Sequence, residues 1–347
     1  MKRFSKFLLF ILVLSMMVMF SVGCSQPSNE EEVVAEEYLI KLSTSEALDP
    51  NISIEAVEAL KFQEYIESKS NGQIKVEIFP GGALGDAESC LEQVKNGVIT
   101  AAASADAKLA TLYAPIQVFS IPYLFETRED AYKMFDESQI VKDLNNDMVE
   151  KTELRIIMFG ENGGFRSFSN DKLEIRTPND MKGLKIRTMS SPLHMDIVKN
   201  LGGVPTPIAW SELYTGLQTG VVDGQENAPA TVKMGHLEEV QKYYTLDNHV
   251  YSMTAFVIND KWLQSLPEEL KAIVLEGGVV AANAGRQACI DNEADILKYL
   301  EENGMQIYSP TTEEFAMFRE ATQKPAMEWL KQNVEDKWID GVVSAAE

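Results

Sequence analysis

The stretch that decides the fold is residues 181–229, MKGLKIRTMSSPLHMDIVKNLGGVPTPIAWSELYTGLQTGVVDGQENAP. Residues 184–188 (LKIRT) alternate apolar and polar side chains, which is typical of a strand. Ser191 and Pro192 then provide an N-cap and a proline at the first helical position, and the glycine pair at 202–203 ends that helix. A strand followed at once by a helix is the repeating unit of layered α/β folds, so the sequence predicts an α/β protein.

The same patterns continue on both sides of this stretch. Strands are expected at 38–42, 74–78, 98–104 and 154–159, and helices at 54–69, from Asp86 to 96, and from the T-x-x-E box at 311–314 onward. From residue 268 to 303 the chain contains no proline, and its glycines at 277, 278 and 285 supply no loop signal. This segment is expected to form one helix long enough to lie across two domains.

Composition and charge exclude several classes of protein. The 347 residues are 45% hydrophobic, which is enough for a packed core and suggests roughly two domains. A net charge of -22 argues against nucleic-acid binding, since such a surface repels phosphates. Cys90 and Cys289 are interpreted as small buried thiols, and the three histidines lack the spacing of a zinc site. No metal and no cofactor is expected.

The N-terminus is interpreted as an export signal. Basic residues precede an apolar run at 8–20, which is shorter than a membrane span needs. The run ends at Ser21-Val22-Gly23-Cys24, which resembles a bacterial lipobox, with Ser21 in place of the usual leucine. We therefore expect a signal peptide at 1–23, lipidation of Cys24 and a flexible acidic tether at 24–37. An ordinary secretory signal is the alternative, and both interpretations export the protein.

Motifs of catalysis are mostly missing. The sequence has no G-x-S-x-G elbow, no P-loop and no G-x-G-x-x-G. Asp223 and Glu226 in the stretch DGQE could act as acid and base or bind a cation, although a turn whose polar groups bond the backbone is the simpler interpretation. The sequence therefore gives no positive evidence for a reaction.

The segments LGD (84–86), IPY (121–123), GFR (164–166), LKIR (184–187), PTP (205–207) and DGQEN (223–227) together carry a strong resemblance. The chain resembles the solute-binding proteins of TRAP (tripartite ATP-independent periplasmic) transporters over essentially its whole mature length. The resemblance implies a two-lobed, periplasmic-binding-protein-like fold with a ligand cleft between the lobes and a long helix spanning both. One lobe is expected at 38–163 with 253–292, and the other at 164–252 with 293–347.

The resemblance also implies a set of ligand-binding residues. Arg187 matches the family arginine that pairs with the ligand carboxylate, Arg166 a second arginine near it, and Asn227 an amide that bonds the ligand. The alternation at 184–188 independently turns Arg187 away from the apolar face. Trp210 matches an aromatic contact, with core packing as the alternative, and Ser190 lies where sialic-acid binders carry an asparagine.

Three further residues concern the far end of the ligand. Ala105 stands where the sialic-acid binders use an acidic residue on the polyol, which argues against sialic acid. Trp210 and Ala105 together lean slightly against a highly hydroxylated sugar. Asp106 and Lys108 are candidates for contacts with that end of the ligand.

The predicted function is that of an exported, lipid-anchored receptor that captures a small organic carboxylate and delivers it to the small and large membrane subunits of a sodium-coupled TRAP permease. No reaction is expected. The alternatives are an exported α/β enzyme that acts on a carboxylate, using Asp223 or Glu226, and a ligand-binding subunit of a sensor system. A turnover assay and the neighbouring genes would separate these possibilities.

Overall fold

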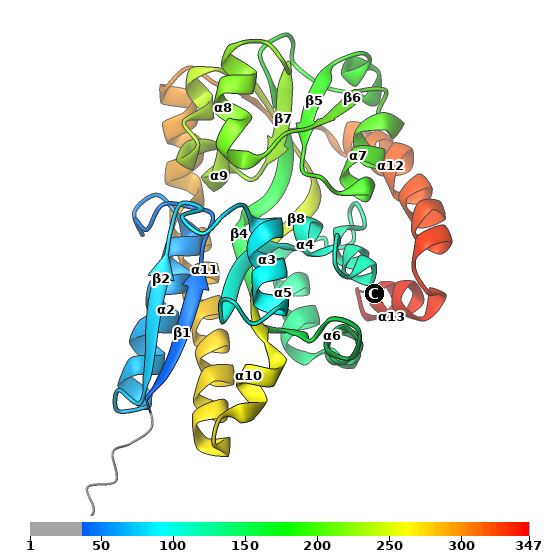
Figure 1. Ribbon diagram of the computed structural model, residues 1–347. Helices are drawn as coiled ribbons and strands as arrows, with labels where there is room; N and C mark the ends of the chain where they lie inside the picture. The colour runs from blue at the N-terminus through cyan, green and yellow to red at the C-terminus, as the bar shows by residue number, and fades with distance from the viewer. Residues whose placement is uncertain (1–36, 347) are drawn as a thin grey trace, which may run out of the picture. The chain divides into compact units, whose positions relative to one another are not determined.

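Two long strands, β4 (Leu154–Asn170) and β8 (Tyr243–Asn259), organise residues 37–346, the part of the chain that the computed structural model describes (Figure 1). The predicted signal peptide, Cys24 and nearly all of the tether lie outside these residues. In the part of the chain that is described, no helix combines the length and apolar character that crossing a membrane requires.

The remaining elements alternate along the chain as the α/β prediction requires. The other strands are β1 (Tyr38–Ser43), β2 (Ile74–Phe79), β3 (Ala101–Ala105), β5 (Lys185–Thr188), β6 (Val204–Pro207), β7 (Gly224–Asn227) and β9 (Gln306–Tyr308). The helices are α2 (Ile54–Lys69), α3 (Ala87–Lys95), α4 (Asp106–Leu109), α5 (Arg128–Glu137), α6 (Gln139–Thr152), α7 (Pro192–Asn200), α8 (Trp210–Gln218), α9 (Pro229–Met234), α10 (Asp260–Ser265), α11 (Glu268–Glu302), α12 (Thr312–Asn333) and α13 (Asp336–Ala346). Short 3₁₀ helices are η1 (Ala114–Ser120), η2 (Pro178–Met181) and η3 (Leu237–Glu239).

The sheet has the strand order β2-β1-β3-β8-β4-β7-β5-β6, with β9 beside β8. Strand β3 pairs with the C-terminal part of β8, and β7 pairs with the C-terminal part of β4. Because β4 and β8 are antiparallel, these two parts lie at opposite ends of the pair, so β1–β3 and β5–β7 form separate groups (Figure 1). The register of the pair shifts between Glu161 and Phe165, where the two strands pass from one group to the other. The fold is the predicted two-lobed α/β architecture.

Local signals in the sequence set the start of several helices. The hydroxyl of Ser53 accepts from the backbone amide of Ala56 and starts α2, and Asp86 caps α3 in the same way. Ser191 caps α7 with proline following it, and α12 opens with a reciprocal capping box between Thr311 and Glu314. These starts confirm the predicted ones.

The long helix predicted at 268–303 is α11, which contacts α2 and β4 in one lobe and α9 in the other. Its glycines permit this close packing. A Cβ on Gly278 would lie 1.9 Å from the carbonyl oxygen of Ile157 in β4, and one on Gly277 would lie 2.6 Å from the Ile66 side chain of α2. Gly277 and Gly278, which weaken the helix pattern, therefore mark the surface on which α11 packs against α2 and β4.

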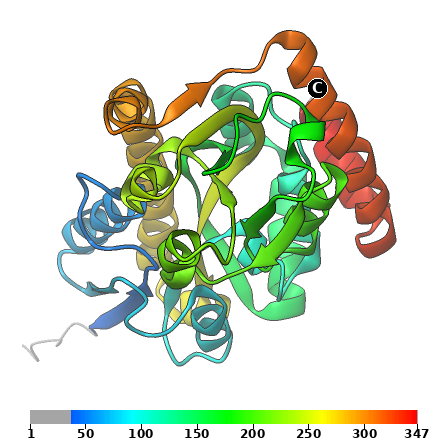
Figure 2. The same ribbon diagram turned by 90° about the horizontal axis from the view of Figure 1, so that it is seen from above.

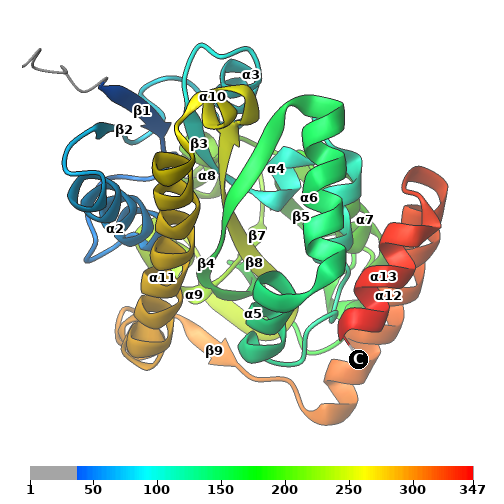
Figure 3. The ribbon, with the colours of Figure 1, turned by 90° about the horizontal axis from the view of Figure 1, so that it is seen from below.

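The C-terminal segment departs from the predicted lobe assignment. Helix α13 packs on α5, α6 and η1, which belong to the predicted first lobe, although 293–347 is assigned to the second. Trp338 and Ile339 join the apolar core of that first lobe. Figures 2 and 3 show α12 and α13, in orange-red to red, on the side of the described part of the chain that lies away from α11. The other lobe limits stay predictions.

Both cysteines in the described part of the chain are buried. Neither Cys90 nor Cys289 forms a disulfide, and burial raises the pKa of both thiols. The interpretation of these residues as small buried thiols is confirmed.

Candidate functional site

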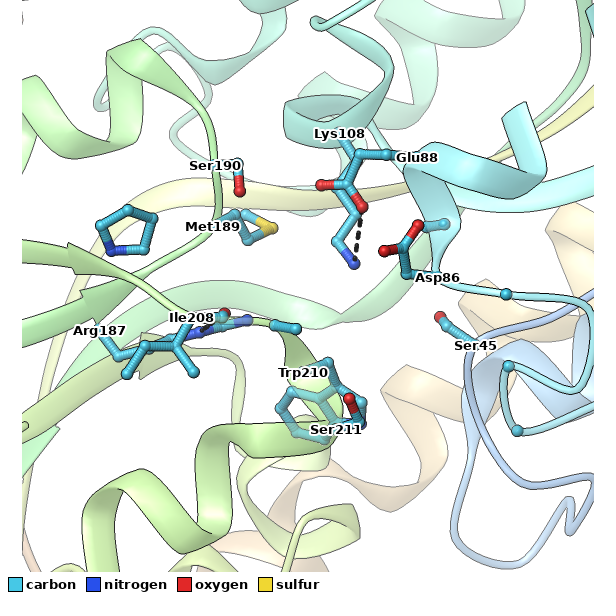
Figure 4. Close-up of a pocket in the computed structure, with 16 residues that line it drawn as sticks. Ser45, Asp86, Glu88, Lys108, Arg187, Met189, Ser190, Ile208, Trp210 and Ser211 are labelled. Atoms are coloured by element: carbon cyan, nitrogen blue, oxygen red, sulfur yellow. Dashed lines mark hydrogen bonds and ion pairs between the residues drawn. The ribbon is translucent and has the colours of Figure 1, made fainter. Parts of the chain in front are cut away.

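A cavity of about 420 Å³ lies between the two lobes, and a smaller recess of about 60 Å³ adjoins it and shares part of its lining. Figure 4 shows Arg187, Met189 and Ser190 on one side of the cavity and Ser45, Asp86 and Glu88 on the other. The first group comes from the predicted second lobe and the second group from the predicted first. A small molecule here would touch both lobes at once.

Strand β5 places Arg187 in this cavity. The side chains of Ile186 and Arg187 point to opposite faces of the strand, which pairs with β6 and β7. Arg187 is 2% exposed, and its Nε donates to the carbonyl oxygen of Ile208 at 2.8 Å. Its two terminal nitrogens make no hydrogen bond to any described residue. This leaves a buried guanidinium with two parallel donors free.

The protonation equilibrium of Arg187 reflects this lack of a partner. Burial is the main cause that lowers its pKa to about 10; Glu226 opposes the shift and the neighbouring Arg166 adds to it. A cation held out of water without a bound anion is unfavourable, and a ligand carboxylate would supply the missing charge and accept from both free donors.

Arg166 and Glu226 form a buried ion pair beside the recess. Arg166 donates from Nε and Nη2 to the Glu226 carboxylate, from Nη2 also to the Glu226 carbonyl oxygen at 2.7 Å, and from Nη1 to the Ser252 hydroxyl at 3.3 Å. Arg166 lines the recess, so it contributes positive charge there although most of its donors are occupied. Burial alone would raise the pKa of Glu226, but Arg166 and the nearby histidines hold it well below its usual range.

Two buried histidines complete this network. The imidazole of His249 lies 2.9 Å from Asp247 and 3.4 Å from Glu226, and it stacks on Phe168. Burial lowers the pKa of His249, but the two carboxylates outweigh burial and raise it to about 9. His194 lies 3.7 Å from the other Glu226 oxygen. These groups hold the Glu226 carboxylate in place, and Glu226 in turn orients Arg166.

The predicted turn at 223–226 is wrong. Residues 224–227 form strand β7, inserted between β4 and β5. Asp223 precedes this strand and accepts from the backbone amide of Lys185 at 2.9 Å, whereas Glu226 is buried against Arg166. The two carboxylates therefore serve separate structural contacts.

The remaining predicted site residues divide into two groups. Asn227, Trp210, Lys108 and Ser190 all line the cavity or its recess. Trp210 also packs beside an apolar cluster of the second lobe, so its position is compatible with both interpretations, and its contact with a ligand stays a prediction. Asp106 is absent from both linings, because its buried carboxylate accepts from the Ser120 hydroxyl inside the first lobe.

Three lining residues had no signal in the sequence. Ser45 and Glu46 follow β1, and Glu55 lies in the first turn of α2, yet all three line the recess. An acidic residue in the first turn of a helix is ordinarily a favourable surface charge, so its sequence position did not indicate burial.

The chain is similar to known proteins in both sequence and fold. Residues 45–332 match the family described as bacterial extracellular solute-binding protein, family 7 (DctP). The chain is 30% identical over 251 residues to the 2,3-diketo-L-gulonate-binding periplasmic protein YiaO of Escherichia coli K12, covering 72% of this chain and 76% of that protein.

Two solved structures are similar as well. The sugar acid binding protein DctPAm of Advenella mimigardefordensis, in complex with galactonate, superposes with a TM-score of 0.83 at 30% identity, covering 90% of this chain and 98% of that chain. A TRAP periplasmic solute-binding protein of Polaromonas, bound to D-erythronate, has a TM-score of 0.81 at 29% identity, covering 89% of this chain and 98% of that one.

Proposed function

This chain belongs to family 7 of the bacterial extracellular solute-binding proteins, and we propose that it captures a small organic carboxylate outside the cytoplasm and delivers it to a TRAP transporter. One observation carries the choice of ligand class: Arg187 presents two free donors from a buried position in the cavity between the lobes. A guanidinium fork matches both oxygens of a carboxylate. The ligands named for the relatives above are themselves organic acids.

The other lining residues fit the same role. Arg187 and the half-buried Trp210 come from the second lobe, while Lys108 and Ser45 come from the first. A ligand that contacts both sets favours the closed arrangement of the lobes, because it makes those contacts together only there. Strands β4 and β8 carry the chain between the lobes, and we place the bending at their register shift near Glu161.

The finer features of the proposal concern the setting of the protein. We propose that Cys24 carries a lipid that holds the mature protein at the outer face of the cell membrane. Its partners are then the small and large subunits of a permease driven by sodium. The cavity binds its ligand without changing it, since the Asp223 and Glu226 carboxylates of the enzyme alternative are both engaged in structural contacts.

The test is a thermal-shift screen of the purified mature protein over organic acids. A ligand at 100 times its dissociation constant adds about 2.7 kcal/mol to the free energy of unfolding, which raises the melting temperature measurably. The proposal expects at least one acid to shift the wild type and to shift the Arg187→Ala protein far less. Recovery of the ligand unchanged after prolonged incubation separates binding from turnover. A screen in which no organic acid shifts the melting temperature would contradict the proposal.

A further inference from the structure

A second cavity lies beside the point where β4 and β8 pass from one lobe to the other. Its volume is about 340 Å³, and it shares no lining residue with the cavity between the lobes or with its recess. A cavity of this size holds a small organic molecule. We call it the hinge cavity, and its lining includes Phe125, Glu126, Phe165, Asn248, Phe315 and Arg319.

The walls of the hinge cavity come from both lobes and from the strands between them. Phe125 and Glu126 lie in the loop before α5, in the predicted first lobe. Phe315 and Arg319 lie in α12, which packs on α7 of the predicted second lobe. Phe165 stands in β4, where the register shift ends. A molecule bound here would therefore touch elements that move relative to one another when the lobes close.

Aromatic side chains form the apolar part of the hinge cavity. Phe125 and Phe165 both pack edge to face against the Tyr251 ring, with centroids 5.8 and 5.7 Å away. Phe315 packs in the same way on Tyr123, at 5.0 Å. Because these neighbours hold the rings in place, the cavity offers a preformed apolar surface to a ligand.

Arg319 supplies a positive charge at this apolar surface. Its guanidinium makes no hydrogen bond to any residue from 37 to 346, and its Nε is buried. Glu126 lies 3.9 Å from Nη2, beyond hydrogen-bonding distance, and its side chain is 80% exposed, so water weakens their attraction. The guanidinium also lies over the Tyr123 ring, 5.7 Å from its centroid. The terminal nitrogens of Arg319 thus stay available as a fork for a carboxylate.

The hinge cavity shares its two strands with the recess of the cavity between the lobes. Phe165 lines the hinge cavity and the next residue, Arg166, lines the recess, because successive side chains of a strand point to opposite faces. On β8, Asn248 lines the hinge cavity and its neighbour His249 contacts Glu226. The Glu226 carboxylate orients Arg166. A molecule in the hinge cavity therefore bears on the same backbone that positions the charged groups of the recess.

We propose that the hinge cavity is a second binding site, which takes a carboxylate with a compact apolar body, such as an aromatic acid, and thereby changes the affinity of the cavity between the lobes. The apolar body packs among the phenylalanine rings, and the carboxylate pairs with Arg319. Coupling follows because an occupant that touches both lobes favours the arrangement in which it makes all of its contacts. Binding of this acid is independent of the proposed function, and only the coupling rests on it.

The first experiment measures this acid by calorimetry on the mature Arg187→Ala protein, in which the cavity between the lobes lacks its carboxylate anchor. The probes are phenylacetate, the neutral phenylacetamide and the cationic phenethylamine. Phenylacetate should bind roughly tenfold or more tightly than either of the others, since only its carboxylate pairs with the arginine fork. Absence of phenylacetate binding, or equal or tighter binding of phenylacetamide or phenethylamine, would overturn the inference.

Further substitutions in the same Arg187→Ala protein identify the site. Arg319→Gln should weaken phenylacetate binding roughly tenfold or more, and Glu126→Gln should strengthen it, because that change removes a neighbouring negative charge. Lys324→Gln is the matched control, since Lys324 is a cation of the same helix that does not line the hinge cavity, and its affinity should stay unchanged. Unchanged affinity in Arg319→Gln, or an equal loss in Lys324→Gln, would overturn the inference.

Coupling is measured on the protein with Arg187 intact, using the acid found by the thermal-shift screen. Saturating phenylacetate should change the dissociation constant of that acid about fivefold or more, and Arg319→Gln should remove the change. A change that persists in Arg319→Gln would indicate competition for the cavity between the lobes and would refute the coupling, as would no change at all. If no acid binds between the lobes, the proposed function fails, while the Arg187→Ala measurements still decide whether the hinge cavity is a site.

Discussion

Replacing Arg187 with methionine should abolish ligand binding without destabilising the ligand-free protein. Methionine retains an unbranched stem but removes the charge and the donors. Arg187 is 2% exposed and has one hydrogen bond, to the Ile208 carbonyl oxygen. The substitution therefore removes one hydrogen bond and one buried charge that has no bound anion.

The two effects on stability have opposite signs. Burial is the main cause that lowers the arginine pKa from its ordinary value to about 10. A pKa change of one corresponds to about 1.4 kcal/mol, so holding the charged form in the folded protein costs on the order of 3 kcal/mol. Loss of the hydrogen bond to Ile208 costs about 1 kcal/mol. The free energy of unfolding of the ligand-free Arg187→Met protein should thus stay level or rise by up to about 2 kcal/mol.

Binding should respond in the opposite direction. Removing one partner of a buried charged pair costs on the order of 2 to 5 kcal/mol, which corresponds to a loss of affinity of roughly 30-fold to several thousand-fold. Calorimetry with the acid found by the thermal-shift screen measures this loss, and thermal unfolding without ligand measures stability. Arg187→Lys should lose most of the affinity as well, because lysine keeps the charge but lacks the planar fork.

The matched control is Lys185→Met, which removes a cation from the exposed position two residues earlier on β5. Its affinity should equal that of the wild type. Affinity of Arg187→Met within threefold of the wild type would refute the assignment of Arg187 as the carboxylate anchor. A large drop in the stability of the ligand-free variant would refute the reasoning about its unpaired charge.

Four other outcomes are expected. Trp210→Ala should weaken ligand binding by roughly 1 to 3 kcal/mol in calorimetry with the fold intact, and unfolding in its place would indicate core packing. Cys24→Ala should release the protein from the membrane fraction or leave it as uncleaved precursor, and a correctly processed protein that stays in the membrane fraction would exclude the lipid anchor. Burial raises the pKa of Glu55 in the folded protein from 4.5 to about 8, so the stability that its proton confers is complete below pH 4.5 and is lost as the pH rises through 8. Urea unfolding should therefore show Glu55→Gln gaining stability relative to the wild type as the pH rises from 5 to 9. If the stabilities of the two proteins change in parallel with pH, this reasoning is wrong. Gly278→Ala should destabilise the protein by at least about 1 to 3 kcal/mol, because its Cβ would lie 1.9 Å from a β4 carbonyl oxygen, whereas Gly216→Ala in α8, with its nearest atom at 3.4 Å, should be tolerated.

The sequence by itself determined the features that depend on neighbours along the chain. Caps such as Ser53 and Asp86 define where helices begin because their side chains bond amides three residues away. Alternation in a strand fixes which side chains share a face, and it turned Arg187 away from the apolar side before any fold was known. The absence of proline from 268 to 303 allowed one long helix, which α11 confirms.

Only the tertiary structure decided which residues hold and orient the charged groups beside the recess. Arg166 and Glu226 are sixty positions apart in the sequence, and they meet because β4 and β7 are neighbours in the sheet. The stretch that contains Glu226 has the composition of a turn, but pairing on both sides makes it a strand, since tertiary hydrogen bonds outweigh local preference.

Contacts between distant segments also explain why Glu46 and Glu55 are buried and where the C-terminal helix packs. Glu46 and Glu55 have the local setting of surface residues, and only the packing around the recess removes them from water. Helix α13 has an apolar face that any core could cover, and its contact with α5 and α6 was settled by where α12 delivers the chain. Local sequence thus determined where the helices and strands form and which way Arg187 points, whereas burial and the choice of partners arose from contacts between segments far apart in the chain.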